Sequence, residues 1–228
     1  MKNVTRSLVL VAVLALLVLV PSAFAGTFEL TSGGPVTYGE ETGPYTATWN
    51  GPAISVWCDD IRDDQNIGSH FTYNMIAGNA IIYGAGTNVM WGNDVNAVNE
   101  YGALAYLMVA VTGNPALVQA LYSFAMWDIF EPGTVAGKVT GNSPFSLATV
   151  TTLVNIALLN YTAADLAAIT LYTPHGCAGL GNNQGQNCFP NSGPGAQEFG
   201  QVPDGGVTFM LLGGALVGLA TLRRRFRA

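Results

Sequence analysis

The segment DVNAVNEYGALAYLMVAV, residues Asp94–Val111, decides the fold class, because its apolar residues follow a different spacing from those before it. They recur at steps of three and four, which is the spacing of one face of an α-helix. The set is Val98, Tyr101, Ala105, Met108 and Val111. Asp94 is the expected N-cap and Gly113 the expected end signal. The segment therefore predicts a helix at the centre of the chain.

Two further helices are predicted after this segment. The first begins at Asn114-Pro115, with Asn as the cap and Pro in the first turn, and ends before Pro132-Gly133. The second begins at Ser143-Pro144 and extends to about Asn160. Both carry apolar residues at helical spacing, namely Leu117, Leu121, Phe124 and Ile129 in the first and Leu147, Val150, Val154, Ala157 and Leu158 in the second.

Short strands are predicted on both sides of these helices. They are rich in β-branched or aromatic residues and are bounded by Gly and Pro clusters. The predicted strands are Thr27–Thr31, Tyr45–Trp49, Ile54–Cys58, Phe71–Ile76, Ile169–Tyr172 and Gln197–Phe199. In the fourth of them, Phe71, Tyr73 and Met75 share one face. Residues 26–201 are therefore predicted to form one α+β domain, in which antiparallel β-strands pack with about three helices.

The N-terminus has the three parts of a secretory signal peptide. A basic start precedes the apolar run Leu8–Val20, and Ala23-Phe24-Ala25 provides the small-residue exit. This pattern predicts a signal peptide over residues 1–25, with cleavage between Ala25 and Gly26. An uncleaved membrane anchor is the alternative interpretation.

Residues 202–228 form a second targeting segment. Val202-Pro203-Asp204-Gly205-Gly206 is followed by the apolar run Val207–Leu222 and then by Arg223-Arg224-Arg225. As a helix, the apolar run is about 24 Å long, which is short for a hydrocarbon core of about 30 Å. We expect this C-terminal transmembrane helix to insert into the membrane. The arginines should stay in the cytoplasm and leave the body on the far side.

This tail resembles the PEP-CTERM class of bacterial sorting signals, and most closely the variant that opens with Val-Pro-Asp-Ser-Gly. Gly205 stands where that variant has Ser. The resemblance implies an exosortase and the secretion machinery as partners, and export to the cell surface or matrix of an exopolysaccharide-producing Gram-negative cell. The expected processing residues are Ala25, Gly26, Val202, Pro203, Asp204, Gly205 and Gly206. A plain tail anchor is the alternative, and both interpretations place the body outside the cytoplasm.

The body between the two ends is strongly acidic. Residues 26–206 hold only Arg62 and Lys138 against all fourteen Asp and Glu residues, a formal charge of 2 − 14, or −12. A domain of this charge repels phosphate backbones, so we expect no nucleic-acid partner.

Two of the three cysteines lie close together in a loop rich in Gly, Asn and Gln. Cys177 and Cys188 bracket residues 178–187. An exported protein meets an oxidising environment, and this loop has little else to hold it, so a disulfide between the two is predicted. In the chain-entropy model, closing so short a loop stabilises the fold by about 2–3 kcal/mol.

Cys58 is the remaining cysteine and ends an apolar strand, in Trp57-Cys58-Asp59. Together with the later Ala125-Met126-Trp127, it resembles the surface domains that form an internal Cys–Gln thioester. In those domains a Gln lies two residues before the Ala, where this chain has Ser123; Gln119 lies one turn earlier on the same helix face. Two interpretations stay open: a thioester between Cys58 and Gln119, and a buried, unreactive Cys58 beside a structural tryptophan.

An acidic run follows this strand. Asp59, Asp60, Asp63, Asp64 and Asn66 offer the carboxylate and amide oxygens that Ca²⁺ prefers. Four close carboxylates repel one another unless a cation bridges or screens them. The spacing differs from that of an EF-hand loop, and a solvated turn partly offset by Arg62 is the alternative.

Catalytic motifs are lacking in this sequence. Its two histidines, His70 and His175, lie in no recognisable hydrolase context, and neither G-x-S-x-G nor H-E-x-x-H occurs. Trp91, in a stretch rich in Gly and Asn, is the tryptophan expected to be exposed.

These observations predict an exported, non-enzymatic protein with a structural or adhesive role in the cell envelope or in an exopolysaccharide matrix or biofilm. The alternatives are a thioester-type covalent adhesin, a calcium-dependent polysaccharide binder and an extracellular hydrolase. The hydrolase would use paired carboxylates.

Overall fold

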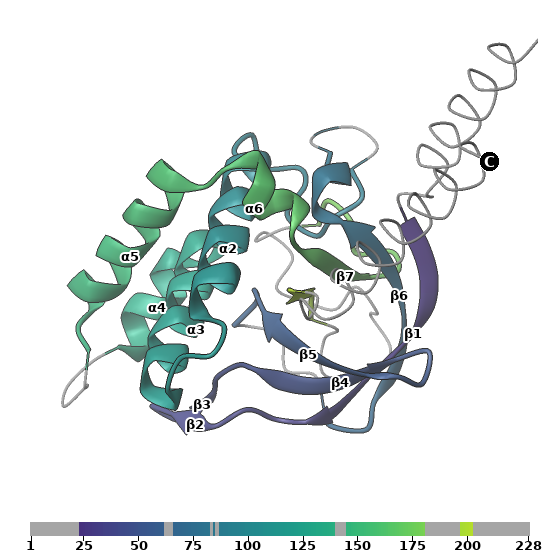
Figure 1. Cartoon of the computed structure of the whole chain (residues 1–228), viewed down its shortest axis with the longest axis horizontal. Coiled ribbons are helices and arrows are strands. Elements are labelled where there is room, and N and C mark those ends of the chain that lie inside the picture. The colour runs from purple at the N-terminus through teal and green to yellow at the C-terminus, as the bar shows by residue number, and fades with distance from the viewer. Residues whose placement is uncertain are drawn as a thin grey trace, which may run out of the picture.

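The computed structural model describes residues 23–61, 66–82, 84, 87–139, 145–180 and 197–202. The described elements form a β-barrel and a group of helices packed against one side of it (Figure 1). The strands are β1 (Ala23–Ser32), β2 (Val36–Thr37), β3 (Glu40–Glu41), β4 (Tyr45–Trp49), β5 (Ala53–Cys58), β6 (His70–Ala77), β7 (Thr170–Pro174) and β8 (Phe199–Gln201). The helices are η1 (Gly78–Ala80), α2 (Ala97–Val111), α3 (Ala116–Phe130), α4 (Pro132–Lys138), α5 (Leu147–Asn160) and α6 (Ala163–Ala167).

Six strands close the barrel in the order β1-β4-β5-β8-β7-β6, and every neighbouring pair is antiparallel. The α+β class and the antiparallel strands predicted from the sequence are therefore confirmed. The short strand β8 completes the ring, since Gly200 pairs with Trp57 of β5 on one side and with Leu171 of β7 on the other. Strands β2 and β3 form a separate hairpin.

Aromatic side chains fill the barrel. The cluster inside it consists of Phe28, Leu30, Tyr45, Ala47, Val56, Cys58, Tyr73, Tyr172 and Phe199. The Phe28 ring lies 4.7 Å from that of Tyr73 and 4.9 Å from that of Phe199, measured between centroids. These side chains come from alternate strand positions, as period-two alternation requires. Of the predicted shared face, Tyr73 belongs to this set, and Phe71 and Met75 are partly buried against it.

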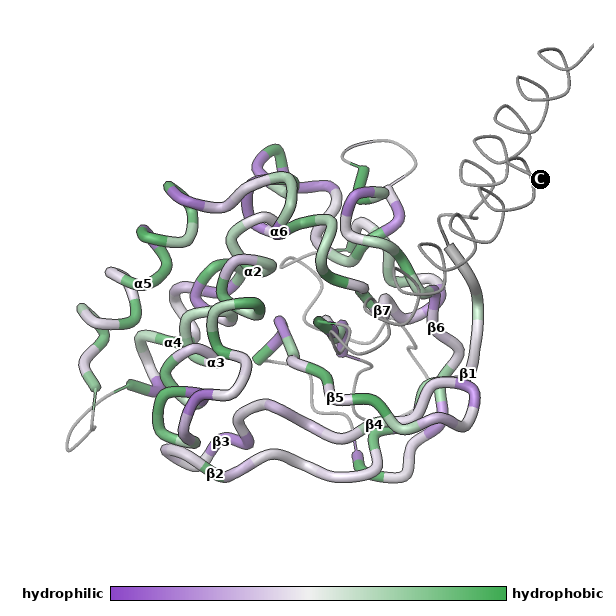
Figure 2. Tube along the Cα trace, in the orientation of Figure 1, coloured by the Kyte–Doolittle hydropathy of each residue, from purple (hydrophilic) through white to green (hydrophobic). Residues whose placement is uncertain are grey.

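The helices build a second core against the outside of β5, β6, β7 and β8. Helix α2 lies at its centre and contacts α3, α5 and α6. Gly200 allows α2 to approach the barrel wall, because a Cβ at this position would lie only 2.7 Å from the sulfur of Met108. Hydrophobic residues are therefore distributed over both parts of the body (Figure 2).

Helix starts differ from the sequence-based expectation. Helix α2 begins at Ala97 rather than after Asp94, because the Asp94 carboxylate accepts a hydrogen bond from Asn96 N (2.8 Å) in a turn before the helix. Helix α5 begins at Leu147, where the Ser146 hydroxyl accepts from Thr149 N (3.2 Å). The predicted start at 143–144 lies outside the described residues.

The short helices α4 and α6 were not predicted, and neither was η1. Pro132 follows the end of α3, as predicted, but it also begins α4, where the missing N–H of proline is tolerated in the first turn. Helix α6 begins with a capping box between Thr162 and Asp165.

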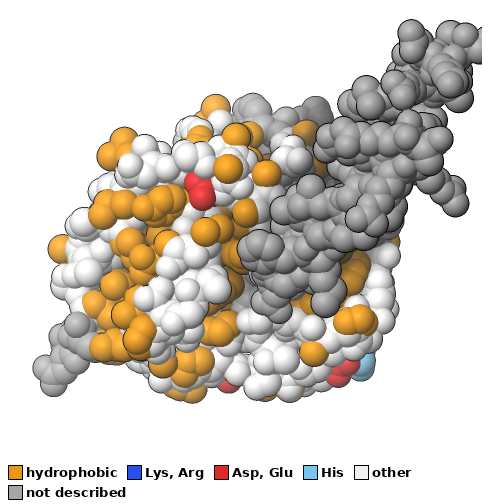
Figure 3. Space-filling model, in the orientation of Figure 1, with side chains coloured by type: hydrophobic (Ala, Val, Ile, Leu, Met, Phe, Trp, Pro, Cys, Tyr) orange, Lys and Arg blue, Asp and Glu red, His pale blue; other side chains and the backbone are white. Residues whose placement is uncertain are grey.

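Hydrophobic side chains gather on the surface of the helical part, where charged groups are few (Figure 3). Leu117 and Leu159 are 54% and 85% exposed. Within the described residues, no helix has both the length and the apolarity needed to cross a membrane. The predicted signal-peptide core and the apolar run 207–222 lie outside these residues. The predicted cleavage point, between Ala25 and Gly26, falls within β1.

Candidate functional site

The residues that follow β5 turn into the protein. Asp59 and Asp60 are 0% and 3% exposed. The burial of these two residues corrects the alternative interpretation, in which they belong to a solvated turn. Asn66, by contrast, is exposed. Asp63 and Asp64 lie outside the described residues. In the described part of the chain, no three His, Cys, Asp or Glu side chains are grouped to hold a metal ion. Because two of the five predicted ligands lie outside that part, the calcium site stays a prediction.

Asp59 instead lies beside a second buried carboxyl group, that of Glu198, just before β8. The Asp59 amide donates to the Glu198 carbonyl at 3.4 Å. The Glu198 carboxylate accepts hydrogen bonds from Met90 N (2.9 Å), the Tyr101 hydroxyl and the Thr173 hydroxyl. It therefore connects β7, α2 and the loop before α2 through one side chain.

The environment of the pair favours a proton on Asp59 rather than on Glu198. Neither carboxyl oxygen of Asp59 receives a hydrogen bond from a described donor. Burial, and next the charge of Glu198, raises the pKa of Asp59 well above its ordinary value. Burial raises the pKa of Glu198 too, but the hydrogen bonds it accepts act in the opposite direction. A protonated Asp59 that donates to an ionised Glu198 satisfies both groups.

Sequence reasoning missed this pair. Glu198 was assigned only to a possible short strand, and its partner lies far away in the sequence. The one local signal was an acidic residue between two strand-like apolar positions, which occurs too often to indicate a buried acid. Barrel closure by β8 brings Glu198 to Asp59.

Cys58 is a free, buried cysteine whose side chain lies inside the barrel. Its thiol donates to the carbonyl of Asp60 (2.8 Å), and its sulfur accepts from Asp60 N (3.3 Å). Burial, followed by the charges of Asp60 and Asp59, raises the pKa of the Cys58 thiol well above its usual range. A thiol in this state is a poor nucleophile.

The predicted thioester partners are not brought together. Gln119 lines a small cavity of about 120 Å³ with Ser55 and Trp57, on the side of β5 that faces the helices. Cys58 lies on the barrel side, as expected for the residue next to Trp57 in a strand. Ser123 has a packing role, because its hydroxyl accepts from Gly43 N (3.0 Å) and donates to the Gln119 carbonyl (3.1 Å).

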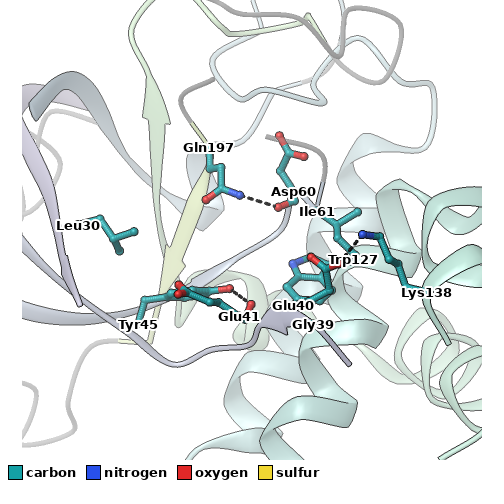
Figure 4. A pocket seen from close by; sticks show the side chains of 10 residues that line it. All are labelled: Leu30, Gly39, Glu40, Glu41, Tyr45, Asp60, Ile61, Trp127, Lys138 and Gln197. Atoms are coloured by element: carbon teal, nitrogen blue, oxygen red, sulfur yellow. Dashed lines mark hydrogen bonds and ion pairs between the residues drawn. The ribbon is translucent and has the colours of Figure 1, made fainter. Parts of the chain in front are cut away.

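A pocket of about 400 Å³ lies at one end of the barrel (Figure 4). Leu30 of β1, Tyr45 of β4, Asp60 after β5 and Gln197 before β8 line it from the barrel. All four come from strand ends at the same rim, because the strands alternate in direction. The β2–β3 hairpin, α3 and α4 complete its wall.

Polar contacts hold the wall of the pocket in place. The Lys138 ammonium on α4 pairs with the Glu40 carboxylate on β3. The Gln197 side-chain amide donates to the carbonyl of Asp60 (3.1 Å). The hairpin, α4 and two strand ends are thereby connected around one space.

Trp127 of α3 contributes a buried indole to this pocket. It is 2% exposed and lines the space, while its ring packs at 5.0 Å on that of Phe124. Its Nε1–H has no hydrogen-bond acceptor among the described residues. In Figure 4 the nitrogen edge of the ring is turned toward Gln197 and Asp60.

The other aromatic and imidazole candidates lie elsewhere. Trp91 was expected to be exposed, but it is only 5% exposed and stacks on Phe130 at 5.3 Å. It is held inside because its neighbour Met90 is bonded to the buried Glu198. His70 and His175 are both exposed, and neither lines the pocket.

Cys177 is fully buried, while Cys188 lies outside the described residues, so the pairing of the two stays a prediction. Of the predicted processing residues at the C-terminal end, Val202 is described and directly follows β8. Pro203, Asp204, Gly205 and Gly206 lie outside the described residues.

Comparison with known protein families identifies the tail. Residues 201–226 match the family described as the VPDSG-CTERM motif. The chain carries a PEP-CTERM-like sorting motif. No curated protein and no solved structure matches the chain. The VPDSG-CTERM motif implies export to the cell envelope or surface, with sorting through the tail. Its first residue, Gln201, is the last residue of β8, so the motif begins where the barrel ends.

Proposed function

We propose that the body of this protein is a non-enzymatic structural or adhesive component of the cell surface or the extracellular polysaccharide matrix. The observation that carries the proposal is the VPDSG-CTERM motif at residues 201–226. Exosortase and the secretion machinery are its proposed partners, since the resemblance to PEP-CTERM signals implies both.

The junction between barrel and tail supports this proposal. Both edges of β8 are paired, and β8 ends at Gln201, one residue before the expected processing segment 202–206. A cut within that segment removes the apolar run and the arginines and leaves every strand of the barrel in place. The mature body is then a separate domain that the cell delivers to its exterior.

The first test is the intact mass of the non-reduced protein recovered from the cell surface. We expect a chain that begins at Gly26 and ends near Pro203. The matched control replaces Arg223, Arg224 and Arg225 by Gln, which should leave the tail uncut. A native chain that still ends at Ala228 contradicts sorting and leaves a tail-anchored membrane protein.

The matrix role has its own test. We expect the mature protein to fractionate with the exopolysaccharide, and a strain that lacks the protein to form a weaker biofilm. A protein that is trimmed but appears only in the free medium, with no change in biofilm mass on deletion, contradicts a structural or adhesive role.

An extracellular hydrolase is the second candidate, because three acidic residues, Glu40, Glu41 and Asp60, line one pocket. It predicts release of reducing ends from polysaccharide, which amide substitutions would stop. The covalent adhesin is disfavoured by the positions of Cys58 and Gln119 on opposite sides of β5. Its signature would be the loss of one ammonia in the same intact mass.

A further inference from the structure

The pocket at the barrel end contains an unsatisfied hydrogen-bond donor. The Trp127 side chain is only 2% exposed, and its indole N–H has no hydrogen-bond acceptor in the described chain. A buried donor without a partner destabilises the fold. An oxygen of a molecule in the pocket would remove that destabilisation, because the indole lines the space itself.

The cavity is what distinguishes this indole from a second one. Trp91 is also buried, at 5% exposure, and its Nε1–H also lacks an acceptor in the described chain. Trp91 does not line the pocket, and its ring is stacked on Phe130. Of these two indoles, Trp127 is therefore the one that combines a donor without an acceptor in the described chain with a space that a ligand can enter.

The charges around the pocket select the class of ligand. Glu40 and Glu41 line the pocket from β3, and Lys138, the one cationic residue that lines it in the described chain, is already paired with Glu40. An anionic ligand would be repelled, both here and by the formal charge of −12 over residues 26–206, which is 2 − 14. A neutral ligand with several hydroxyl groups can donate to the carboxylates and accept from Trp127.

The size and the rings of the pocket fit the same class. Its volume of about 400 Å³ lies within the range of small-molecule sites. Tyr45 and Trp127 supply aromatic surface, which suits the apolar face of a sugar ring.

We infer that this pocket binds a neutral, hydroxyl-rich saccharide unit, with the Trp127 N–H donating to one of its oxygens. The inference rests on the proposed matrix function and names the ligand class through which the body would hold polysaccharide. Gln197, which bonds the segment after β5, and the Lys138–Glu40 pair position the wall around the sugar.

The test follows the indole N–H signals of the full-length mature chain by nitrogen-15 NMR while sugars are added. The neutral probes are cellohexaose, isomaltohexaose and mannohexaose, with free glucose and free mannose to separate a polymer unit from a soluble sugar. Oligogalacturonate is the anionic probe, and calcium chloride alone is the cation probe. We expect the Trp127 signal to move with at least one neutral probe, while the Trp91 signal stays in place.

Two variants form a matched pair. Trp127→Phe keeps an aromatic ring and removes the donor, so it should lower the affinity for that neutral probe at least about tenfold, which corresponds to about 1.4 kcal/mol. Trp91→Phe removes the other unpartnered donor and should leave the affinity within about twofold. The NMR measurement on the unsubstituted chain stands even if a variant fails to fold.

Three results would overturn the inference. No neutral probe moves the Trp127 signal, calcium chloride alone moves it, or oligogalacturonate moves it more strongly than any neutral probe does. Equal losses in both variants would also overturn it. A chain that is trimmed and held in the matrix but ignores every sugar leaves the proposed function intact. A chain that binds neutral sugar but still ends at Ala228 refutes sorting and keeps the pocket.

Discussion

At the scale of the residue, the buried carboxyl pair is the main electrostatic feature of the described body. Asp59 and Glu198 are both fully buried, and burial raises the pKa of each carboxyl group. We assign the charge to Glu198, which accepts from three donors, whereas neither carboxyl oxygen of Asp59 accepts from a donor in the described chain. The two acids therefore contribute to stability in opposite ways.

The substitution Asp59→Asn should make the stability of the protein less sensitive to rising pH. Because the pKa of Asp59 is raised in the folded state, its protonation contributes stability below the unfolded value of 3.8. That stability is lost progressively as the pH rises from there to the folded pKa, by up to about 1.4 kcal/mol per pH unit. Asparagine can donate to Glu198 without titrating. Thermal melts from pH 5 to pH 8 should show a smaller drop in Tm for the variant than for the native chain.

Glu198→Gln is the contrasting change. It removes the charged acceptor of Tyr101, Thr173 and Met90 N, and we expect it to lower the Tm at every pH in that range. The reverse pattern, with Glu198→Gln stabilising and Asp59→Asn destabilising, would place the proton on Glu198 and refute the assignment.

At the scale of the element, glycines allow close contacts between segments. A Cβ on Gly78 of η1 would lie 2.0 Å from the carbonyl oxygen of Leu166, which belongs to the backbone of α6 and cannot turn away. Around Gly137 of α4, by contrast, a Cβ would meet nothing within 4 Å. The same substitution therefore has opposite consequences at these two positions.

Gly78→Ala should destabilise the protein by about 1–3 kcal/mol through overpacking against α6. Gly137→Ala should stabilise it by about 0.4–1 kcal/mol, because alanine loses less backbone freedom on folding. Denaturant unfolding followed by circular dichroism measures both. Equal effects of the two changes would show that η1 and α6 are not in contact as the structure has them.

At the scale of the whole molecule, the barrel depends on its last described strand. Phe199–Gln201 pairs with β5 and with β7, and Phe199 lies inside the barrel beside Phe28. Glu198 is adjacent to this strand. The chain that closes the barrel is thus the chain that leads into the sorting motif, so the position of the cut decides whether the domain keeps its fold.

A mature chain that ends after Val202 should unfold cooperatively with the same Tm as the uncut body. One that ends after Ala196 loses β8 and Glu198, and it should melt at a much lower temperature or lack a cooperative transition. Calorimetry on the two truncated chains makes the comparison. A shorter chain that melts like the longer one would show that β8 contributes nothing to closure.

The sequence by itself determined the classes of element and the C-terminal sorting motif. Strands such as Tyr45–Trp49 coincide with the observed β4, and α2 forms where the apolar spacing changes, since both signals are local. The sorting motif is equally local and is confirmed over residues 201–226. The helix starts were predicted less well. Asp94 accepts a hydrogen bond from Asn96 N in a turn before α2, whereas Ser146 accepts one from Thr149 N in the first turn of α5, and the sequence does not distinguish the two roles.

Only the tertiary structure decided the candidate site. Trp127 was known as part of Ala125-Met126-Trp127, but nothing in that motif showed a pocket at the barrel rim or an indole without an acceptor. Likewise, the sequence placed Asp59 in an acidic run that could be solvated, and only the tertiary structure shows that closure of the barrel by β8 places Glu198 beside it. The physical reason is that burial and a pKa depend on neighbours supplied by distant segments. A pattern of adjacent residues cannot contain that information.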